Sequence, residues 1–262
     1  MFEIIFASYL YDVSSKTQMK HKIALIMPYF GKWPVWIDLY FYSCYMNPMI
    51  DFYFFTDFPK PNILPDNVLY HYINWQDYCG IISKSLDIEF NHKNPYKLCD
   101  IRPFYGLIHQ NLLVDYDFWG YGDIDVCYGN INKWITDKIL EKYDVISSHS
   151  DRVSGHFCLI RNIAKFREIP LTFYNWKNRI LEERVFGFDE YDVTGYNFPN
   201  IYLAHRAYRY LGKPFGIGLN VFFDFVMRFF TIGKRIYMKE QWTSQIPKNG
   251  EWWTYDLEDG SV

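Results

Sequence analysis

Short apolar runs alternate along the chain with longer segments in which apolar residues recur every three or four positions. Continuous apolar runs bounded by turn residues predict strands buried on both faces, whereas the longer spacing predicts amphipathic helices. The predicted strands are 23–27, 50–56, 67–74, 144–149, 156–162 and the part of 117–129 that ends near two acidic residues.

The predicted helices lie between and after these strands. They are 36–45, 98–112, 132–143 and 171–184. Pro103 lies inside the second helix and predicts a kink or a late start there, and Asn130 or Asn132 is expected to cap the third. This alternation predicts an α/β fold with a mixed, mostly parallel sheet flanked by helices in a single domain.

Two acidic residues follow the apolar run at 118–122. Aspartate is a poor strand former, yet DYDFWGYGDIDVCYGN places Asp123 and Asp125 directly after this run. In extended backbone both side chains would point the same way, and two neighbouring carboxylates repel each other unless a cation lies between them. Mg²⁺ and Mn²⁺ take one or two protein carboxylates and complete their shell with phosphate oxygens and water. The pair therefore predicts a metal–diphosphate site, and the alternative is a surface turn with solvated acids.

The surroundings of the acid pair favour the metal site. Gly120, Gly122 and Gly129 would let a ligand approach the backbone. Ligands of such sheets bind at the carboxyl ends of the strands. The acid pair lies at the end of one predicted strand, and Asp57 lies at the end of the second predicted strand, 50–56.

Composition narrows the class of protein. The chain has 262 residues, half of them hydrophobic and 21% aromatic, which suits one domain with a large core and leaves aromatics for sugar-binding surfaces. A net charge of -3 argues against a nucleic-acid partner. The cysteines are dispersed and form no CxxC pair, which argues against a zinc knuckle or a disulfide framework and favours a reducing cytoplasm.

Membrane and targeting signals are weak. No run reaches the ~18 apolar residues of a membrane span. The nearest, 218–235, is broken by Asp224 and Arg228 and fits either a core helix or an interfacial one. The expected location is the cytoplasm, with a peripheral contact at the inner face of the cell membrane left open.

A resemblance to a known family rests on four stretches. The DxD segment of GT-A-fold glycosyltransferases, which use nucleotide-diphosphate sugars, is similar to FWGYGDIDVCYGN. A bacterial glycosyltransferase-like family, often linked to surface-polysaccharide synthesis, has a first strand and helix that resemble KIALIMPYFGKWPVWIDLYFYSC. The helix before its DxD strand resembles NPYKLCDIRPFYG, and the strand after it resembles GHFCLIRN.

The resemblance implies a domain organisation. An N-terminal extension, 1–21, precedes a GT-A-like (Rossmann-like) domain over 22–262. Its nucleotide-binding part is 22–165, which the resemblance covers well, and its acceptor-side part is 166–262, where GFDE and EWWTYDLEDG are also similar to the family.

The resemblance also implies a metal and a nucleotide site. Asp125 would coordinate Mn²⁺ or Mg²⁺ directly, Asp123 would contact the metal or the ribose, and His205 would supply a distal metal ligand. The expected contacts with the nucleotide are Pro28 and Tyr29 at the base, Asp57 at the base or ribose, and Lys97 and Asp100 from the helix before the DxD strand.

Glycosyl transfer needs further groups. A bound metal stabilises the charge of the leaving nucleoside diphosphate, and an inverting enzyme needs a carboxylate that accepts the proton of the acceptor hydroxyl. Asp189 and Glu190 are the candidate bases, with Asp192 a third, whereas a retaining enzyme would not need this base. His156 is expected to line the acceptor pocket and His149 to end a strand. The candidate acceptor rim is Trp33, Trp36, Trp252, Trp253 and Tyr255.

The predicted function is a metal-dependent glycosyltransferase of hexosyltransferase type. It would move a sugar from a nucleotide-diphosphate donor, a UDP-sugar first among them, to a saccharide or lipid-linked saccharide in polysaccharide biosynthesis. One alternative is a catalytically inactive sugar- or nucleotide-binding domain. A weaker one is a phosphatase of the haloacid-dehalogenase type with Asp123 as nucleophile, although that motif normally follows the first strand.

Overall fold

A single mixed sheet organises the part of the chain that the computed structural model describes, residues 19–148, 153–173, 175–190 and 236–238. The strand order is β3-β2-β1-β4-β6-β5-β7. The strands are β1 (Ile23–Pro28), β2 (Ile50–Thr56), β3 (Val68–Tyr72), β4 (Phe118–Gly122), β5 (Val145–Ser147), β6 (Phe157–Arg161) and β7 (Ile236–Met238). The structure thus confirms the strands predicted within residues 23–161.

Most neighbouring strands run parallel. β3, β2, β1 and β4 are parallel to one another, and β6 is antiparallel to both β4 and β5. Register pairs Ile23 with Phe118 and Leu25 with Gly120, so β1 and β4 end at the same edge of the sheet. This arrangement confirms the expected mixed, mostly parallel α/β sheet and is compatible with a Rossmann-like fold.

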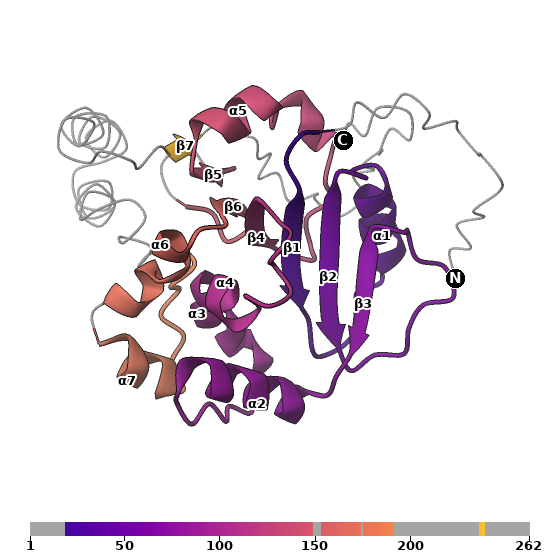
Figure 1. The fold of residues 1–262 in the computed structure, drawn as a ribbon. Helices are drawn as coiled ribbons and strands as arrows, with labels where there is room; N and C mark the ends of the chain where they lie inside the picture. The colour runs from indigo at the N-terminus through magenta and orange to yellow at the C-terminus, as the bar shows by residue number, and fades with distance from the viewer. Residues whose placement is uncertain (1–18, 149–152, 174, 191–235, 239–262) are drawn as a thin grey trace, which may run out of the picture.

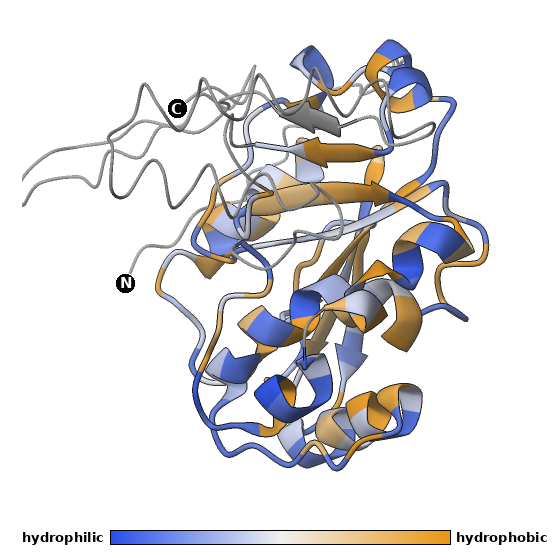
Figure 2. Cartoon of the chain, turned by 90° about the vertical axis from the view of Figure 1, so that its left-hand side faces the viewer, coloured by the Kyte–Doolittle hydropathy of each residue, from blue (hydrophilic) through white to orange (hydrophobic). Residues whose placement is uncertain are grey.

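Helices cover both faces of the sheet (Figure 1). They are α1 (Ile37–Tyr45), α2 (Trp75–Leu86), α3 (Leu98–Ile101), α4 (Tyr105–Ile108), α5 (Asp137–Lys142), α6 (Ala164–Arg167) and α7 (Trp176–Leu181). One core cluster joins α1 and α5 to one face, and the other joins α2, α3, α4, α6 and α7 to the opposite face. Figure 2 shows the expected polarity, with apolar central strands between helices that carry both colours. Among the described residues, no helix is long and apolar enough to cross a membrane.

The helix predicted over 98–112 is broken into short pieces. 3₁₀ turns at Pro95–Lys97 and Arg102–Phe104 flank α3, and α4 ends at Ile108. Pro103 lies in the second turn, where a regular helix would lose a backbone hydrogen bond. The expected irregularity at Pro103 is confirmed, but the helix is shorter than predicted.

Two other predicted helices, and the predicted cap of one of them, need correction. The predicted helix 132–143 is a 3₁₀ turn, Ile131–Lys133, followed by α5. Neither expected asparagine caps it; instead the Asn47 side chain accepts a hydrogen bond from the amide of Ile131 at 2.9 Å. The predicted helix 171–184 is also not continuous. Its first two residues end the 3₁₀ turn Ile169–Thr172, and α7 is the only α-helix among its described residues.

The helix α2 was not predicted. Its signal is a capping pattern, because the Asn74 side chain accepts a hydrogen bond from the amide of Asp77 at 2.9 Å. Trp75, Tyr78 and Ile82 then bury one face of the helix against the sheet.

Candidate functional site

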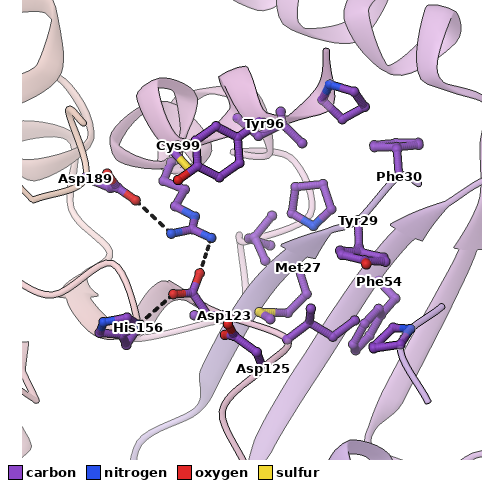
Figure 3. Close-up of a pocket in the computed structure, with 18 of the residues that line it drawn as sticks. Met27, Tyr29, Phe30, Phe54, Tyr96, Cys99, Asp123, Asp125, His156 and Asp189 are labelled. Atoms are coloured by element: carbon purple, nitrogen blue, oxygen red, sulfur yellow. Dashed lines mark hydrogen bonds and ion pairs between the residues drawn. The ribbon is translucent and has the colours of Figure 1, made fainter. Parts of the chain in front are cut away.

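A cavity of about 1220 Å³ lies where β1 and β4 end. Its walls come from residues 26–36, from 94–105 before β4, from 122–125 after β4, and from 185–190. Figure 3 shows Tyr29 toward one end and Asp189 toward the other, with Asp123 and Asp125 between them. The predicted position of a ligand at the carboxyl ends of the strands therefore coincides with a cavity.

The acid pair lies in a turn and not in a strand. β4 ends at Gly122, and the amide of Asp123 donates to the carbonyl oxygen of His156 at 3.2 Å. The expectation of extended backbone through the pair is thus wrong, although both side chains line the same cavity. The two carboxylates have different surroundings: the Asp123 side chain is 20% exposed, whereas Asp125 is exposed.

Asp123 is neutralised by protein groups. Its carboxylate forms an ion pair with Arg102 and a hydrogen bond with Nδ1 of His156 at 2.7 Å. Burial alone would raise the pKa of Asp123, but the His156 hydrogen bond and the Arg102 charge together lower it. The same hydrogen bond raises the pKa of His156 against the effect of burial. Both oxygens of the Asp123 carboxylate thus have a protein partner.

Asp125 is the available acid of the pair. Its carboxylate lines the cavity and has no hydrogen-bond or ion-pair partner among the described residues. Trp36 fixes the turn, because its indole nitrogen donates to the carbonyl oxygen of Ile124 at 3.3 Å. An exposed carboxylate on a fixed turn fits a divalent cation that takes its other ligands from a diphosphate and from water. Among the described residues, no cluster of three or more His, Cys, Asp or Glu forms an all-protein metal site.

Two further acids reach the cavity from residues 185–190. Asp189 is 4% exposed and pairs with Nη1 of Arg102 at 2.7 Å, and Glu190 is partly exposed beside it. Burial raises the pKa of Asp189 to about 6, although the Arg102 charge opposes that shift. Both candidate bases therefore lie at the cavity.

Aromatic side chains form the other end. Pro28 and Tyr29, which the resemblance places at a nucleotide base, line the cavity. The Tyr29 amide donates to the carbonyl oxygen of Phe55 at 2.9 Å. Trp33 stacks on Tyr29 with 5.7 Å between ring centroids and 8° between planes. Phe58 stacks on Trp33 at 4.7 Å. Part of the Tyr29 ring is thus already covered, so a base would meet a preformed aromatic group.

Three predicted nucleotide contacts lie elsewhere. Lys97 and Asp100 are 2% and 0% exposed, pair with each other at 2.9 Å and do not line the cavity. Asp57 is exposed after β2 and does not line it either. The predicted contact of Lys97 with a phosphate is wrong, because its ammonium is buried and donates to protein carbonyl oxygens.

The glycines of β4 serve packing within the protein. A Cβ at Gly120 would collide with the carbonyl oxygen of Cys158 on the neighbouring strand. A Cβ at Gly122 would collide with the hydroxyl of Tyr128. We expected Gly120 and Gly122 to make room for a ligand. Instead, the space beside each of them is filled by another part of the protein. Gly129 accepts a hydrogen bond from the Asn47 side chain through its carbonyl oxygen.

Arg102 was missed by the sequence analysis, although it stands in the quoted stretch NPYKLCDIRPFYG. No local signal marked it, because its partners Asp123 and Asp189 lie 21 and 87 positions away in the sequence. Of the other predicted residues, Trp33, Trp36 and His156 line the cavity. The remaining predictions, His149, Asp192, His205, Trp252, Trp253 and Tyr255, lie outside the described residues.

Comparison with known proteins identifies the family. No curated protein matches the chain in sequence. A family model matches residues 25–220, which is more than half of the chain and includes all four segments that line the cavity. On this match, the chain belongs to the DUF6625 family, a family of unknown function.

Proposed function

We propose that the protein is a metal-dependent glycosyltransferase that uses a nucleotide-diphosphate sugar, with a UDP-sugar as the first candidate. The observation that carries the proposal is the available Asp125 carboxylate beside Asp123, facing a cavity with an aromatic end and a carboxylate end. The acceptor is a saccharide or a lipid-linked saccharide. The mixed, mostly parallel sheet is compatible with the GT-A architecture that the sequence resemblance implies.

The cavity suits a large, elongated ligand. Its volume of about 1220 Å³ exceeds that of common small-molecule pockets, roughly 300–1000 Å³. Tyr29 and Trp33 line one end and offer aromatic surface to a base. Asp125 lies between Tyr29 and Asp189 (Figure 3). A nucleotide-diphosphate sugar placed along this line would put its sugar near Asp189.

The charges of the cavity favour a metal requirement. Its described lining has four carboxylates, those of Asp123, Asp125, Asp189 and Glu190. Against them stand Lys32, Arg102 and His156, whose pKa is raised. A diphosphate would therefore be repelled unless a cation accompanied it. When bound, Mn²⁺ or Mg²⁺ would be held by Asp125 and would supply Lewis-acid stabilisation of the leaving diphosphate.

Asp189 is the better candidate base. With a pKa of about 6 it is mostly ionised at neutral pH and still a competent proton acceptor. Arg102 holds one of its oxygens at 2.7 Å, which orients the carboxylate. In an inverting reaction, Asp189 takes the proton of the acceptor hydroxyl as the acceptor oxygen forms a bond to the anomeric carbon. The bond between sugar and phosphate breaks, and the nucleoside diphosphate leaves. Glu190 is the second candidate.

The test is calorimetric binding of UDP, GDP, CDP and ADP, each with and without Mn²⁺. We expect one nucleotide to bind only with Mn²⁺ and Asp125→Ala to abolish this binding while leaving the fold intact. The matched control is Asp66→Ala, because Asp66 is also exposed but precedes β3, at the opposite edge of the sheet. Metal-independent binding, or equal binding by wild type and Asp125→Ala, contradicts the proposal.

The second candidate is a catalytically inactive domain that binds a nucleotide or a sugar. It is favoured by one observation: Arg102 and His156 already neutralise Asp123. Nucleotide binding without any release of sugar from the bound donor would support it. The same two contacts engage both Asp123 oxygens and disfavour a phosphatase nucleophile at this position.

A further inference from the structure

The segment that carries the candidate bases is held by side chains from residues 97–102. Lys97 donates to the carbonyl oxygens of Arg179 at 2.8 Å and Arg184 at 2.6 Å. Asp100 balances this buried ammonium and lies 2.9 Å from it. The path of the chain after α7 is therefore fixed from a distant part of the sequence.

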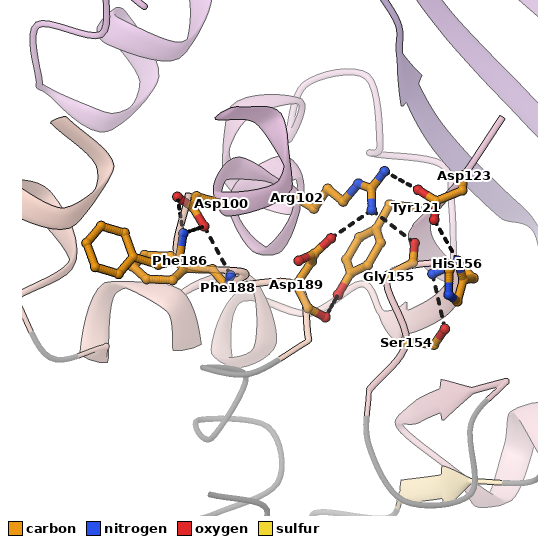
Figure 4. Close-up of polar contacts among 10 residues, drawn as sticks. All are labelled: Asp100, Arg102, Tyr121, Asp123, Ser154, Gly155, His156, Phe186, Phe188 and Asp189. Atoms are coloured by element: carbon orange, nitrogen blue, oxygen red, sulfur yellow. Dashed lines mark hydrogen bonds and ion pairs between the residues drawn. The ribbon is translucent and has the colours of Figure 1, made fainter. Parts of the chain in front are cut away.

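Asp100 continues this hold toward the cavity (Figure 4). Its carboxylate accepts hydrogen bonds from the amide of Phe186 at 2.9 and 3.0 Å and from the amide of Phe188 at 3.2 Å. Asp189 follows Phe188 directly, so its backbone position is set by Asp100. Tyr121 adds a contact from β4, with its hydroxyl 3.5 Å from the carbonyl oxygen of Asp189.

Arg102 makes the last link and fixes the Asp189 side chain. Its Nη1 pairs with Asp189 at 2.7 Å and donates to the carbonyl oxygen of Gly155 at 3.2 Å, while its Nη2 pairs with Asp123. The Arg102 side chain is only 17% exposed. A planar guanidinium can satisfy three acceptors at once, whereas a lysine ammonium on a flexible stem offers no such fork.

The surroundings of Gly155 show independently that the bridge, the pairing of Arg102 with both Asp189 and Asp123, is tightly packed. A Cβ at residue 155 would lie 2.9 Å from the Asp189 carboxylate and 3.1 Å from Nη1 of Arg102. Residue 155 therefore has room for glycine alone without displacement of the ion pair.

We infer that Arg102 is a positioning residue: it holds the acceptor-side carboxylate of Asp189 at a fixed place relative to Asp123, the acid at the end of β4. The use of this link in transfer rests on the proposed function. Without the guanidinium, the carboxylates of Asp123 and Asp189 would repel each other across the cavity wall. Arg102 acts through Asp189 and does not itself accept the proton.

The test compares amide hydrogen exchange in Arg102→Lys, Gly155→Ala and wild type. Loss of the bridge should speed exchange at the amides of Phe188 and Glu190 about tenfold, because opening of this segment becomes easier by about 1.4 kcal/mol. Arg161→Lys is the matched control: Arg161 is 22% exposed and pairs with Asp144 at 2.7 Å away from the cavity. Gly155→Ala keeps the guanidinium but would displace the ion pair. It tests the positioning role of Arg102 if Arg102→Lys does not fold.

A kinetic experiment tests whether the ion pair between Arg102 and Asp189 contributes to the proposed sugar transfer. The probe is hydrolysis of the sugar donor whose nucleotide binds with Mn²⁺, followed as release of nucleoside diphosphate across pH. The charged groups that face Asp189 are Arg102, Glu190 and Asp123. The Arg102 charge lowers the pKa of Asp189, and a lysine would keep that charge. The acid limb of the rate profile should therefore move upward in Arg102→Gln and stay in place in Arg161→Gln.

The outcomes separate the two proposals. Unchanged exchange at Phe188 and Glu190 in both bridge variants overturns the positioning role. Faster exchange with an unshifted acid limb overturns its use in transfer. If wild type binds no nucleotide with Mn²⁺, the proposed transferase fails, and the exchange comparison alone decides whether Arg102 holds Asp189.

Discussion

Asp123 and Asp125 stand two positions apart, but their carboxylates contribute differently to the stability of the fold. Asp123 is part of a partly buried ion network with Arg102 and His156. Asp125 is exposed at the cavity and has no such partners among the described residues. Removing the charge of a paired, buried group leaves its partner uncompensated, whereas an exposed carboxylate contributes little to folding.

This difference predicts unequal effects on stability. Asp123→Asn should lower the free energy of unfolding by about 2 kcal/mol, because the Arg102 charge loses one of its two carboxylates. Asp125→Asn should change it by less than about 0.5 kcal/mol. Urea unfolding of both variants measures the two values. Equal losses would show that the Asp123 network contributes no more to stability than the exposed acid.

At the scale of elements, β4 depends on close packing against its neighbours. The strand is buried along its whole length, and Gly120 pairs with Leu159 of antiparallel β6 and with Leu25 of β1. The carbonyl of Cys158 occupies the space that a Cβ at Gly120 would need. Because this obstacle is backbone, it cannot move aside as a flexible side chain could.

Gly120→Ala should therefore cost about 3 kcal/mol or more in the free energy of unfolding. The control is Gly80→Ala in α2, where a Cβ would meet nothing within 4 Å. That substitution should stabilise the protein by about 0.5–1 kcal/mol, because alanine favours a helix interior. Urea denaturation of the pair tests the prediction, and a neutral Gly120→Ala would contradict the tight contact.

The central strands were predictable because they are short apolar runs buried on both faces, as in Ile23–Pro28. The helices before and after β4 were less predictable, since their ends depend on partners distant in sequence. Asp100 accepts hydrogen bonds from Phe186 and Phe188, so it serves another segment and not a regular helix. Local spacing contains no information about such a pairing.

The same limit applied to the candidate site. Asp123 and Asp125 could be placed from a strand end, and Tyr29 from the sequence resemblance; all three line the cavity. Arg102 could not, because its function in the structure depends on Asp189, 87 positions away. Lys97 was misplaced for the related reason that the carbonyls of Arg179 and Arg184 hold its ammonium.

At the scale of the whole molecule, a buried histidine couples folding to pH. His109 follows α4, stacks on Phe55 at 4.6 Å between ring centroids, and shares a 2.9 Å hydrogen bond with the Tyr78 hydroxyl. Burial lowers the pKa of His109 to about 3, with a smaller contribution from His71. The imidazole is thus neutral in the folded core, where a charge would lack compensation.

The sign of the coupling follows from this pKa. An unfolded histidine titrates near 6.5, so between about pH 6.5 and 3 the unfolded state binds more protons than the folded state. The contribution of His109 is complete above about pH 6.5 and falls by up to about 1.4 kcal/mol per pH unit on acidification. Replacing His109 by glutamine keeps a partner for Tyr78 and removes this proton uptake.

We therefore expect urea unfolding of His109→Gln to depend less steeply on pH than that of wild type between about pH 6 and 4. The control is His71→Gln on β3: His71 is exposed, and burial lowers its pKa without a large shift. Its slope should stay close to wild type, because little proton uptake accompanies exposure of a side chain already near water. A His109→Gln slope equal to wild type would mean that His109 is protonated in the folded core, which is incompatible with its stacked, apolar surroundings.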